Sequence, residues 1–295
     1  RFGNLGNIAS EDPSQTRILQ LESPVITTTE LEALVDYFGE DARTIDCTFP
    51  SDRGTRLREA LERLRQEAEE AVRGGARDLV LTDEHVGPGR APIPMILAAG
   101  AVHSHLVRQG LRSFASITVR SAECLDVHYF AVLIGVGVTA INPYLTEAAI
   151  ADRHARGLFP GLTLPECLAR YKEAVNQGLL KIMSKMGISI VSSYRGGYNF
   201  EAVGLSRSLC REYFPGLITR ISGIGLTGIK NKVFAMHAQA FGEAEPPLAI
   251  GGFYRYRRGG EAHALEARMI HQIQHAVATD SYQAYKKYAE QVHAQ

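Results

Sequence analysis

The chain has 295 residues, of which 45% are hydrophobic and 22% are charged. Its 32 lysine and arginine residues balance 32 aspartate and glutamate residues, so the formal net charge is zero. This composition indicates a globular protein with enough apolar residues for a core, and it excludes a disordered or collagen-like chain. A zero balance provides no general attraction to nucleic acid or to an anionic membrane surface, so we expect neither as a partner.

The cysteines, the longest uncharged run and the first residue restrict the class further. No CxxC pair exists to hold zinc, an iron–sulfur cluster or a redox disulfide, so we expect four buried thiols in a reducing compartment. Glycine and proline interrupt the uncharged run at 127–146, which argues against a membrane span. The chain starts at Arg1 without a signal segment, and we expect that processing or excision from a longer chain produced this start.

Short apolar runs alternate with helical patterns along most of the chain. Strands are predicted, in chain order, at 44–49, 78–81, 114–119, 138–142, 188–192 and 217–221. Helices are predicted at 57–72, 94–108, from about 125, from about 146, and at 165–186, 200–212 and 229–241. The helix at 165–186 has an apolar side and ends at Gly187, a typical capping residue.

Six strand–helix units in series predict an α/β protein with a mainly parallel sheet, either open or closed like a barrel. We favour an incomplete, rudimentary TIM-barrel-like series, because the units are alike and a complete barrel has eight. Residues 4–25 are interpreted as a polar lead-in and 242–262 as a linker. The tyrosine-rich amphipathic helix expected at 281–292 has a face that needs a partner to cover it. We therefore divide the chain into domains at 1–241 and 242–295.

Gly223, Gly225 and Gly228 match the GxGxxG pattern between a predicted strand and a predicted helix. A dinucleotide site requires this context, but a Rossmann domain carries the pattern in its first unit rather than its last. We therefore favour a strand-to-helix turn that uses glycine for positive φ.

Other candidate side chains have simple structural interpretations. His271 and His275 are spaced to share a metal on one helix face, but a solvated helix face is the favoured interpretation. Lys181 and Lys185 are four residues apart and could form a Schiff base, bind phosphate or lie at an interface, but a solvated cationic face near a helix C-terminus is the favoured interpretation. His103 and His105 fall on different helix faces and are not expected to form a ligand pair.

In a barrel, the polar residues that follow the strands gather at one end, where barrel enzymes place their sites. These are Ser51, Asp52, Asp83, Glu84, Arg120, Glu123, Asn142, Ser193 and Arg195. Arg195, Gly196 and Gly197 could bind an anion through a guanidinium and a close backbone. The alternative is that these loops are polar only because loops are usually solvated.

Several segments closely resemble the central domain of the large subunit of bacterial glutamate synthase. They are LKIMSKMGIS at 180–189, SYRGG at 193–197, FEAVGL at 200–205, APIP at 91–94, HYF at 128–130, LIG at 133–135 and NPYL at 142–145. The resemblance covers nearly the whole chain. It implies a cytoplasmic subunit in which a glutamine amidotransferase domain, this domain, an FMN-binding barrel with an iron–sulfur cluster and a β-helix follow one another.

The resemblance implies an enzyme that converts L-glutamine and 2-oxoglutarate to two L-glutamate. Its central domain joins the two catalytic domains and helps to shape the path of ammonia, so we expect no catalytic, cofactor-binding or metal-binding residue in this segment. The implied partners are the flanking domains and a small electron-donating subunit or ferredoxin. Residues 251–260 resemble the entry to the FMN domain, although LEAR at 265–268 departs from the family pattern. The alternative is a free-standing barrel-like enzyme that binds an anionic or phosphate ligand near Arg195–Gly197.

Overall fold

The computed structural model describes residues 19–52, 54, 56–242 and 249–294. The chain divides into two compact units, Arg1–Phe241 and Gly242–Gln295. The larger unit is an α/β structure with a parallel sheet, which confirms the predicted class.

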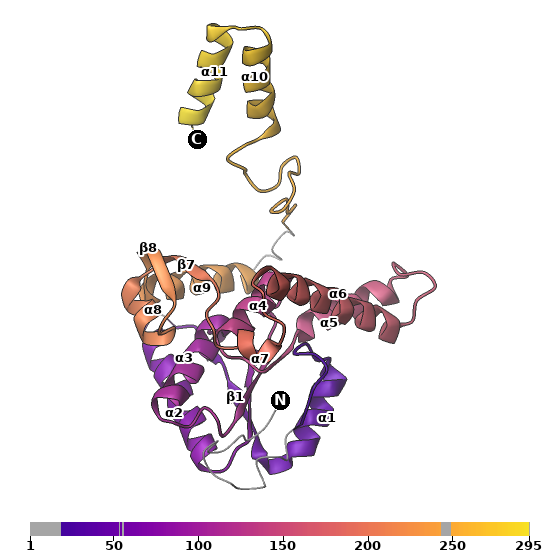
Figure 1. Ribbon diagram of the computed structural model, residues 1–295, viewed down its shortest axis with the longest axis vertical. Coiled ribbons are helices and arrows are strands. Elements are labelled where there is room, and N and C mark those ends of the chain that lie inside the picture. Colours follow the sequence, from indigo (N-terminus) through magenta and orange to yellow (C-terminus); the bar gives the residue numbers. More distant parts are fainter. Residues whose placement is uncertain (1–18, 53, 55, 243–248, 295) are drawn as a thin grey trace. The chain divides into compact units, whose positions relative to one another are not determined.

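Four parallel strands form the main sheet in the order β1-β3-β5-β6. They are β1 (Ala42–Asp46), β3 (Asp78–Thr82), β5 (Ser116–Arg120) and β6 (Ala140–Asn142). The connecting helices are α2 (Leu57–Arg73), α3 (Met95–Arg108) and α4 (Val127–Gly135). Each strand lies beside the one before it, so right-handed crossovers place these helices on the same face of the sheet. Figure 1 shows α2 and α3 on one side of β1 and α1 (Thr28–Phe38) on the other.

Side chains alternate between the two faces of the sheet, so its buried apolar residues form two separate layers. Leu79, Leu81 and Ile117 belong to the large core that the sheet forms with α2, α3 and α4. Ala140 belongs to a second cluster, with Leu34 and other buried residues of α1. Helix α1 therefore covers the sheet face opposite the three connecting helices.

The outer edge of β6 is occupied by an early part of the chain. Val25 forms a parallel bridge to Ile141, and the Ile26 amide donates to the Ile141 carbonyl at 2.9 Å. The strand predicted at 188–192 is absent, because residues 24–26 already take the position beside β6. The chain turns at Gly187, which has φ 71°, and forms α7 (Val191–Tyr194) instead. The main sheet therefore contains four strands rather than one continuous series of six, and the described residues contain no closed barrel.

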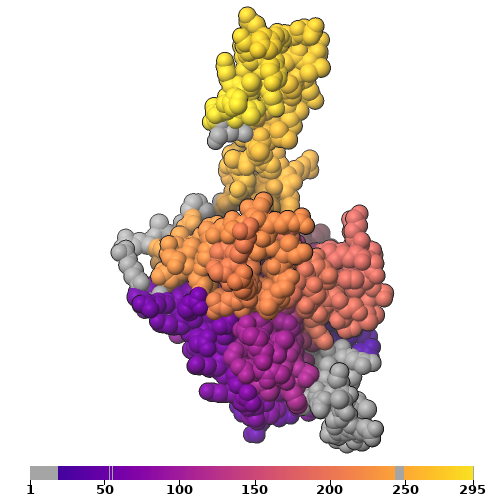
Figure 2. Space-filling model, turned by 60° about the vertical axis from the view of Figure 1, so that its left-hand side comes forward, coloured from indigo at the N-terminus to yellow at the C-terminus, as the bar shows by residue number. Residues whose placement is uncertain are grey.

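Strands β7 (Glu201–Leu205) and β8 (Ile218–Ile224) form a separate parallel pair, joined by α8 (Arg207–Tyr213) and followed by α9 (Leu226–Ala240). The helix predicted at 200–212 is wrong in its first half, because Gly204 has φ 78° and its segment pairs with β8. A Cβ atom on Gly223 would lie 2.1 Å from the Gly204 carbonyl oxygen. In Figure 2 the orange surface of residues 200–240 lies against the indigo and purple surface of the first strand–helix units.

The strand predicted at 44–49 is two strands separated by Cys47. The second, β2 (Thr48–Pro50), pairs antiparallel with β4 (Arg90–Pro92). After β6 come α5 (Tyr144–Ala155) and α6 (Leu164–Lys185). Helix α6 buries Val175, Leu179 and Met183 and is followed by Gly187 with positive φ, as predicted. A short 3-10 helix, η2 (Gly39–Asp41), links α1 to β1.

The smaller unit contains a hairpin of α10 (Ala267–Ala278) and α11 (Tyr282–His293). Tyr282 and Tyr285 are 70% and 46% exposed and stack with a ring separation of 6.1 Å. The tyrosine face is thus open, as expected for a face that needs a partner. Of the predicted segments outside the series, most of the lead-in at 4–25 and residues 243–248 of the linker lie outside the described residues.

Candidate functional site

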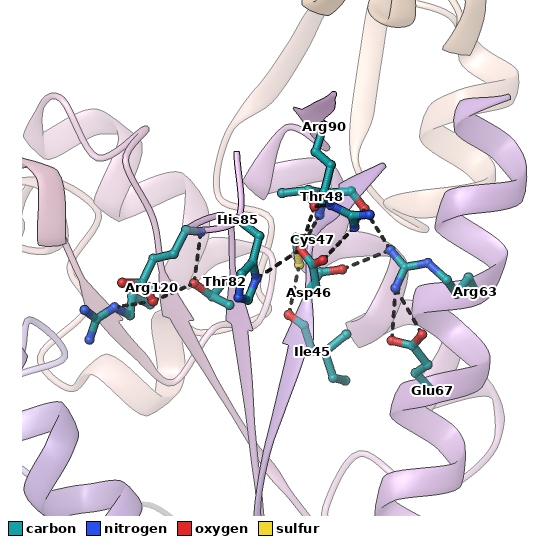
Figure 3. A network of polar contacts seen from close by, with 11 residues as sticks. Ile45, Asp46, Cys47, Thr48, Arg63, Glu67, Thr82, His85, Arg90 and Arg120 are labelled. Atoms are coloured by element: carbon teal, nitrogen blue, oxygen red, sulfur yellow. Dashed lines mark hydrogen bonds and ion pairs between the residues drawn. The ribbon is translucent and has the colours of Figure 1, made fainter. Parts of the chain in front are cut away.

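The carboxyl ends of β1, β3, β5 and β6 meet at one edge of the sheet, and a connected set of polar side chains lies there (Figure 3). Asp46 ends β1 and accepts hydrogen bonds from the Thr48 amide at 2.9 Å and the Thr48 hydroxyl at 2.8 Å. Arg90 donates to Asp46 at 2.6 Å and to the Thr48 hydroxyl at 2.7 Å. Asp46 therefore holds the β1–β2 turn against β4.

Arg63 from α2 completes this part of the network. Its guanidinium donates to the backbone carbonyls of Asp46 at 2.9 Å and Thr48 at 3.0 Å, and it pairs with Glu67 at 3.0 Å. Burial raises the pKa of Asp46, but the hydrogen bonds from Thr48 and the charge of Arg90 outweigh burial, so the pKa is lowered. Asp46 is thus a stable carboxylate and a poor proton donor.

A second set connects the ends of β3 and β5. The Thr82 hydroxyl bonds to Glu84 at 3.2 Å, and Arg120 pairs with Glu84 at 2.7 Å. The Arg120 guanidinium also lies 5.6 Å from the centre of the Tyr144 ring, which begins α5. Arg120 therefore links the ends of two strands to the helix that follows β6.

Asp83 is buried at this edge of the sheet, and Glu123 is half-buried there. Asp83 accepts from the Ser121 hydroxyl at 2.6 Å and the Ala122 amide at 3.1 Å, whereas Glu123 accepts from the Met95 amide at 2.7 Å and from the Tyr129 hydroxyl. Burial raises the pKa of both groups. Raised carboxyl pKa values are common at catalytic sites, but these two carboxyl groups are occupied by bonds to strand ends and a helix start.

Hydrogen bonds and ion pairs join the polar side chains at this edge of the sheet into one layer. Burial raises the pKa of Cys47, so its side chain stays a thiol rather than a nucleophilic thiolate. Within the described ranges, no three His, Cys, Asp or Glu side chains are placed to hold one metal ion. All four cysteines are buried and free, as predicted.

Arg195 does not join this edge, contrary to the expectation for a residue after a strand. It follows α7, and the next amide, of Gly196, donates to the carbonyl of Ile134 at the end of α4. Gly196 also lies beside Gly137, which precedes β6, so Arg195 lies near the amino end of the sheet. Gly197 closes the turn by donating to the Tyr194 carbonyl at 3.1 Å.

Arg195 lines a cavity of about 80 Å³ together with Ser23, Thr139 and Ser192. Its guanidinium has no hydrogen-bond or ion-pair partner among the described residues, and burial lowers its pKa. A few residues further along the chain, the Tyr198 hydroxyl and the Asn199 side-chain nitrogen are fully buried. Neither has a hydrogen-bond partner among the described residues. A role for Arg195, Gly196 and Gly197 in binding an anion stays a prediction.

The cluster around Arg112 was missed at the sequence level. Arg112 donates to His103 Nδ1 at 3.0 Å and to the Gly137 carbonyl at 2.7 Å. Burial, followed by the charges of Arg112 and Arg195, lowers the pKa of His103 to about 3. Burial also raises the pKa of Asp78, which is fully buried at the start of β3, to about 7. The only sequence signal was a charged residue, Asp78, inside an apolar strand.

The remaining candidates lie on exposed faces. Lys181 and Lys185 are exposed on α6, and His271 and His275 are exposed on α10. His105 pairs with Glu69 at 2.6 Å, whereas His103 contacts Arg112, so the two side chains have different partners, as expected for different faces of the helix. An interface role for the two lysines stays a prediction.

Fold and site together define an α/β domain with parallel strands in sequential order, whose polar strand ends are bonded to one another. A family model described as the glutamate synthase central domain matches residues 1–206. The chain belongs to this family.

Three relatives illustrate the similarity. The chain is 60% identical to the glutamate synthase [NADPH] large chain of Azospirillum brasilense over 99% of its own length, and 36% identical to that of Bacillus subtilis over 97%. It is 37% identical to the chloroplastic ferredoxin-dependent glutamate synthase of Spinacia oleracea over 97% of its length. The chain spans 19% of the length of each of these relatives. None of the helices in the described ranges combines the length and apolar composition needed to cross a membrane.

Proposed function

We propose that the chain is the central, connecting part of a glutamate synthase that converts L-glutamine and 2-oxoglutarate to two L-glutamate. In this proposal it joins a glutamine amidotransferase domain to an FMN-binding synthase domain, and residues 242–295 begin the latter. The match over residues 1–206 and relatives about five times longer support this position within a longer chain.

The observation that supports a connecting rather than a catalytic role is that the carboxyl groups at the strand ends are bonded to neighbouring parts of the domain. A β/α protein usually builds its catalytic site there. Here Asp46, Asp83, Glu84 and Glu123 are each bonded to a neighbouring strand, turn or helix. A layer of this kind makes the domain rigid, and a rigid domain keeps two attached active sites at a constant separation.

The proposed role includes shaping the path along which ammonia passes between the active sites. Shielding from bulk water keeps ammonia neutral and nucleophilic, because protonation would make it unreactive. FMN and the iron–sulfur cluster are assigned to other parts of the longer protein, and electrons to a small subunit or ferredoxin. The buried, separate cysteines do not fit a cluster site in this segment. A cytoplasmic location belongs to the same proposal.

The relationship of this fold to a TIM barrel is also part of this proposal. The sequential parallel strands β1, β3, β5 and β6, with their connecting helices on one face, support a rudimentary relative of a TIM barrel. Helix α1 and residues 24–26 take the places that further strands would occupy in a complete barrel.

The test uses the full-length enzyme with Lys181→Glu and Lys185→Glu on α6, and with Lys232→Glu on α9 as the matched control. All three side chains are exposed in this segment. If the α6 lysines face a neighbouring domain, charge reversal uncouples the active sites, so more glutamine is hydrolysed than 2-oxoglutarate is converted and free ammonia accumulates. The control keeps a ratio of one to one. Turnover of substrate by the 295-residue chain alone, or tight binding of FMN to it, would contradict the connecting role.

A second candidate function is anion binding near Arg195, supported by the unpaired guanidinium beside the small cavity. An anion there would be attracted by both Arg195 and the nearby Arg112, whose pKa burial and Arg195 lower to about 9. In that case Arg195→Gln lowers the number of inorganic phosphate ions that the purified chain binds at saturation. Unchanged phosphate binding by this variant excludes the second candidate.

A further inference from the structure

A cavity of about 520 Å³ lies where α2, α8 and α9 begin, and none of its lining residues belongs to the strand-end layer described above. Each of these helices follows a strand, so their starts lie at carboxyl ends, where β/α proteins commonly bind phosphate groups. The cavity is within the size range of small-molecule sites. Nothing in the proposed function uses it.

Positive charge dominates the wall of the cavity. Arg56, Arg58 and Lys230 line it, and Glu212 is its acidic residue. Glu212 is already paired with Arg58 at 2.9 Å and with the buried Arg65 at 3.4 Å. Arg56 lies 3.8 Å from Glu59, so Lys230 is the lining cation without an acidic partner among the described residues.

Lys230 is the cation best placed to receive a ligand. It lies in the first turns of α9, is half-buried, and has its ammonium 5.6 Å from the centre of the Phe234 ring. It pairs with no carboxylate among the described residues. A half-buried ammonium without a counter-ion favours an incoming anion, because the anion restores the interactions lost with water.

Hydroxyl and backbone donors surround the same space. Ser206, Ser208 and Thr227 contribute hydroxyl groups to the lining. Among the described residues, no side chain caps the start of α9 at Gly225, so amides of this long helix stay available. These hydrogen-bond donors supplement the positive charge of the cationic side chains, which is the main attraction for an anion.

The GxGxxG pattern has a structural explanation here. Gly223 lets β8 approach β7, and a Cβ atom on Gly228 would lie 2.7 Å from Ile224 Cβ. None of the three glycines has positive φ, so the expected left-handed turn is wrong, and close packing is the reason for glycine. That packing brings the starts of α8 and α9 to one cavity.

We propose that this cavity binds the phosphate group of a small phosphate monoester. Three cationic side chains, three hydroxyl groups and the amides at the start of α9 suit a tetrahedral dianion with several acceptor oxygens better than a flat carboxylate. The volume exceeds that of a phosphate ion and leaves room for the organic part of the ligand. The inference is independent of the connecting role, and either can fail alone.

The test titrates the 295-residue chain with inorganic phosphate and with glycerol phosphate at constant ionic strength, with calorimetry as the readout. Saturable binding of both is expected, with the ester at least as tight as the ion. Lys230→Gln weakens binding about tenfold, the usual loss for one charge-assisted contact. The matched control Lys232→Gln, two positions from the lining residue Lys230 but outside the cavity wall, leaves the affinity unchanged.

Ser208→Ala is a second test variant, and circular dichroism checks that every variant is folded. It removes one donor and is expected to weaken phosphate binding about threefold. The proposal is overturned if neither probe saturates, if only the inorganic ion binds, or if Lys232→Gln weakens binding as much as Lys230→Gln. Loss of binding in Arg195→Gln but not in Lys230→Gln would assign the phosphate to the other cavity and would also overturn it.

Discussion

Val25 pairs with Ile141 in a parallel bridge, although 115 residues of the chain lie between them. The Ile141 amide donates to the Pro24 carbonyl at 2.8 Å, and Val25 is 1% exposed. The bridge fills the edge of the sheet at which another strand–helix unit would have continued the series. It thereby determines how many strands the main sheet contains.

Val25→Ala should therefore destabilise the larger unit by about 1–3 kcal/mol, because two buried methyl groups are lost at a closed edge. Urea unfolding measures this as a lower midpoint with an unchanged slope. Val107→Ala, on the exposed side of α3, should change stability by less than about 0.5 kcal/mol. Equal effects of the two variants would mean that the bridge does not stabilise the sheet.

Gly223→Ala should separate β7 from β8, since the added Cβ would lie 2.1 Å from the Gly204 carbonyl oxygen. Backbone cannot move as a flexible side chain does, so we expect a loss of about 2 kcal/mol or more. Gly89→Ala is the matched control, because nothing lies within 4 Å of its Cβ position. Thermal unfolding compares them, and a neutral Gly223→Ala would contradict the close packing of the two strands.

The buried carboxyl group of Asp78 should make the stability of the folded chain depend on pH. Its pKa rises from 3.8 to about 7 on folding, mainly through burial, so the folded state holds a proton that the unfolded state releases. Stability should therefore fall as pH rises from about 4 to about 7 and should level off above that range. A rise of about three units corresponds to at most about 4 kcal/mol.

Asp78→Asn removes this dependence, so its stability relative to the unmodified chain should increase from pH 4 to pH 7 in urea unfolding. Thr118→Val serves as a companion variant, because Thr118 donates to Asp78 at 2.9 Å and favours the ionised form. Losing that donor should steepen the fall in stability with pH. A constant difference between Asp78→Asn and the unmodified chain would refute the prediction.

Arg90→Gln should cost about 1 kcal/mol at neutral pH, because Asp46 loses its ion pair and Thr48 loses a donor. The pKa of Asp46 is lowered in the folded state, so this contribution is present above about 3.8 and is lost as pH falls through the folded pKa. The difference from the unmodified chain should narrow in that acidic range. Arg156→Gln, which breaks the more exposed pair with Asp152, should have little effect at either pH.

Local spacing predicted several of the helices and part of the polar edge. The apolar side of α2, the side of α6 that contains Leu179 and the cap at Gly187 follow from residues three or four positions apart, and the structure confirms them. Asp83, Arg120 and Glu123 were also expected at one end of the sheet, because each follows a strand in a regular β/α unit. These features depend on neighbours in the sequence.

The sequence by itself therefore determined the α/β class, the amphipathic helices, the buried cysteines and, through its motifs, membership of the glutamate synthase central domain family. Only the tertiary structure decided that 188–192 forms no strand, that 201–205 does, and that Arg195 lies away from the polar edge. Strand pairing joins distant segments, and an apolar run of five residues suits a strand, a turn or a short helix. Which one forms depends on whether a sheet edge is free, and Val25 had already taken the edge beside Ile141.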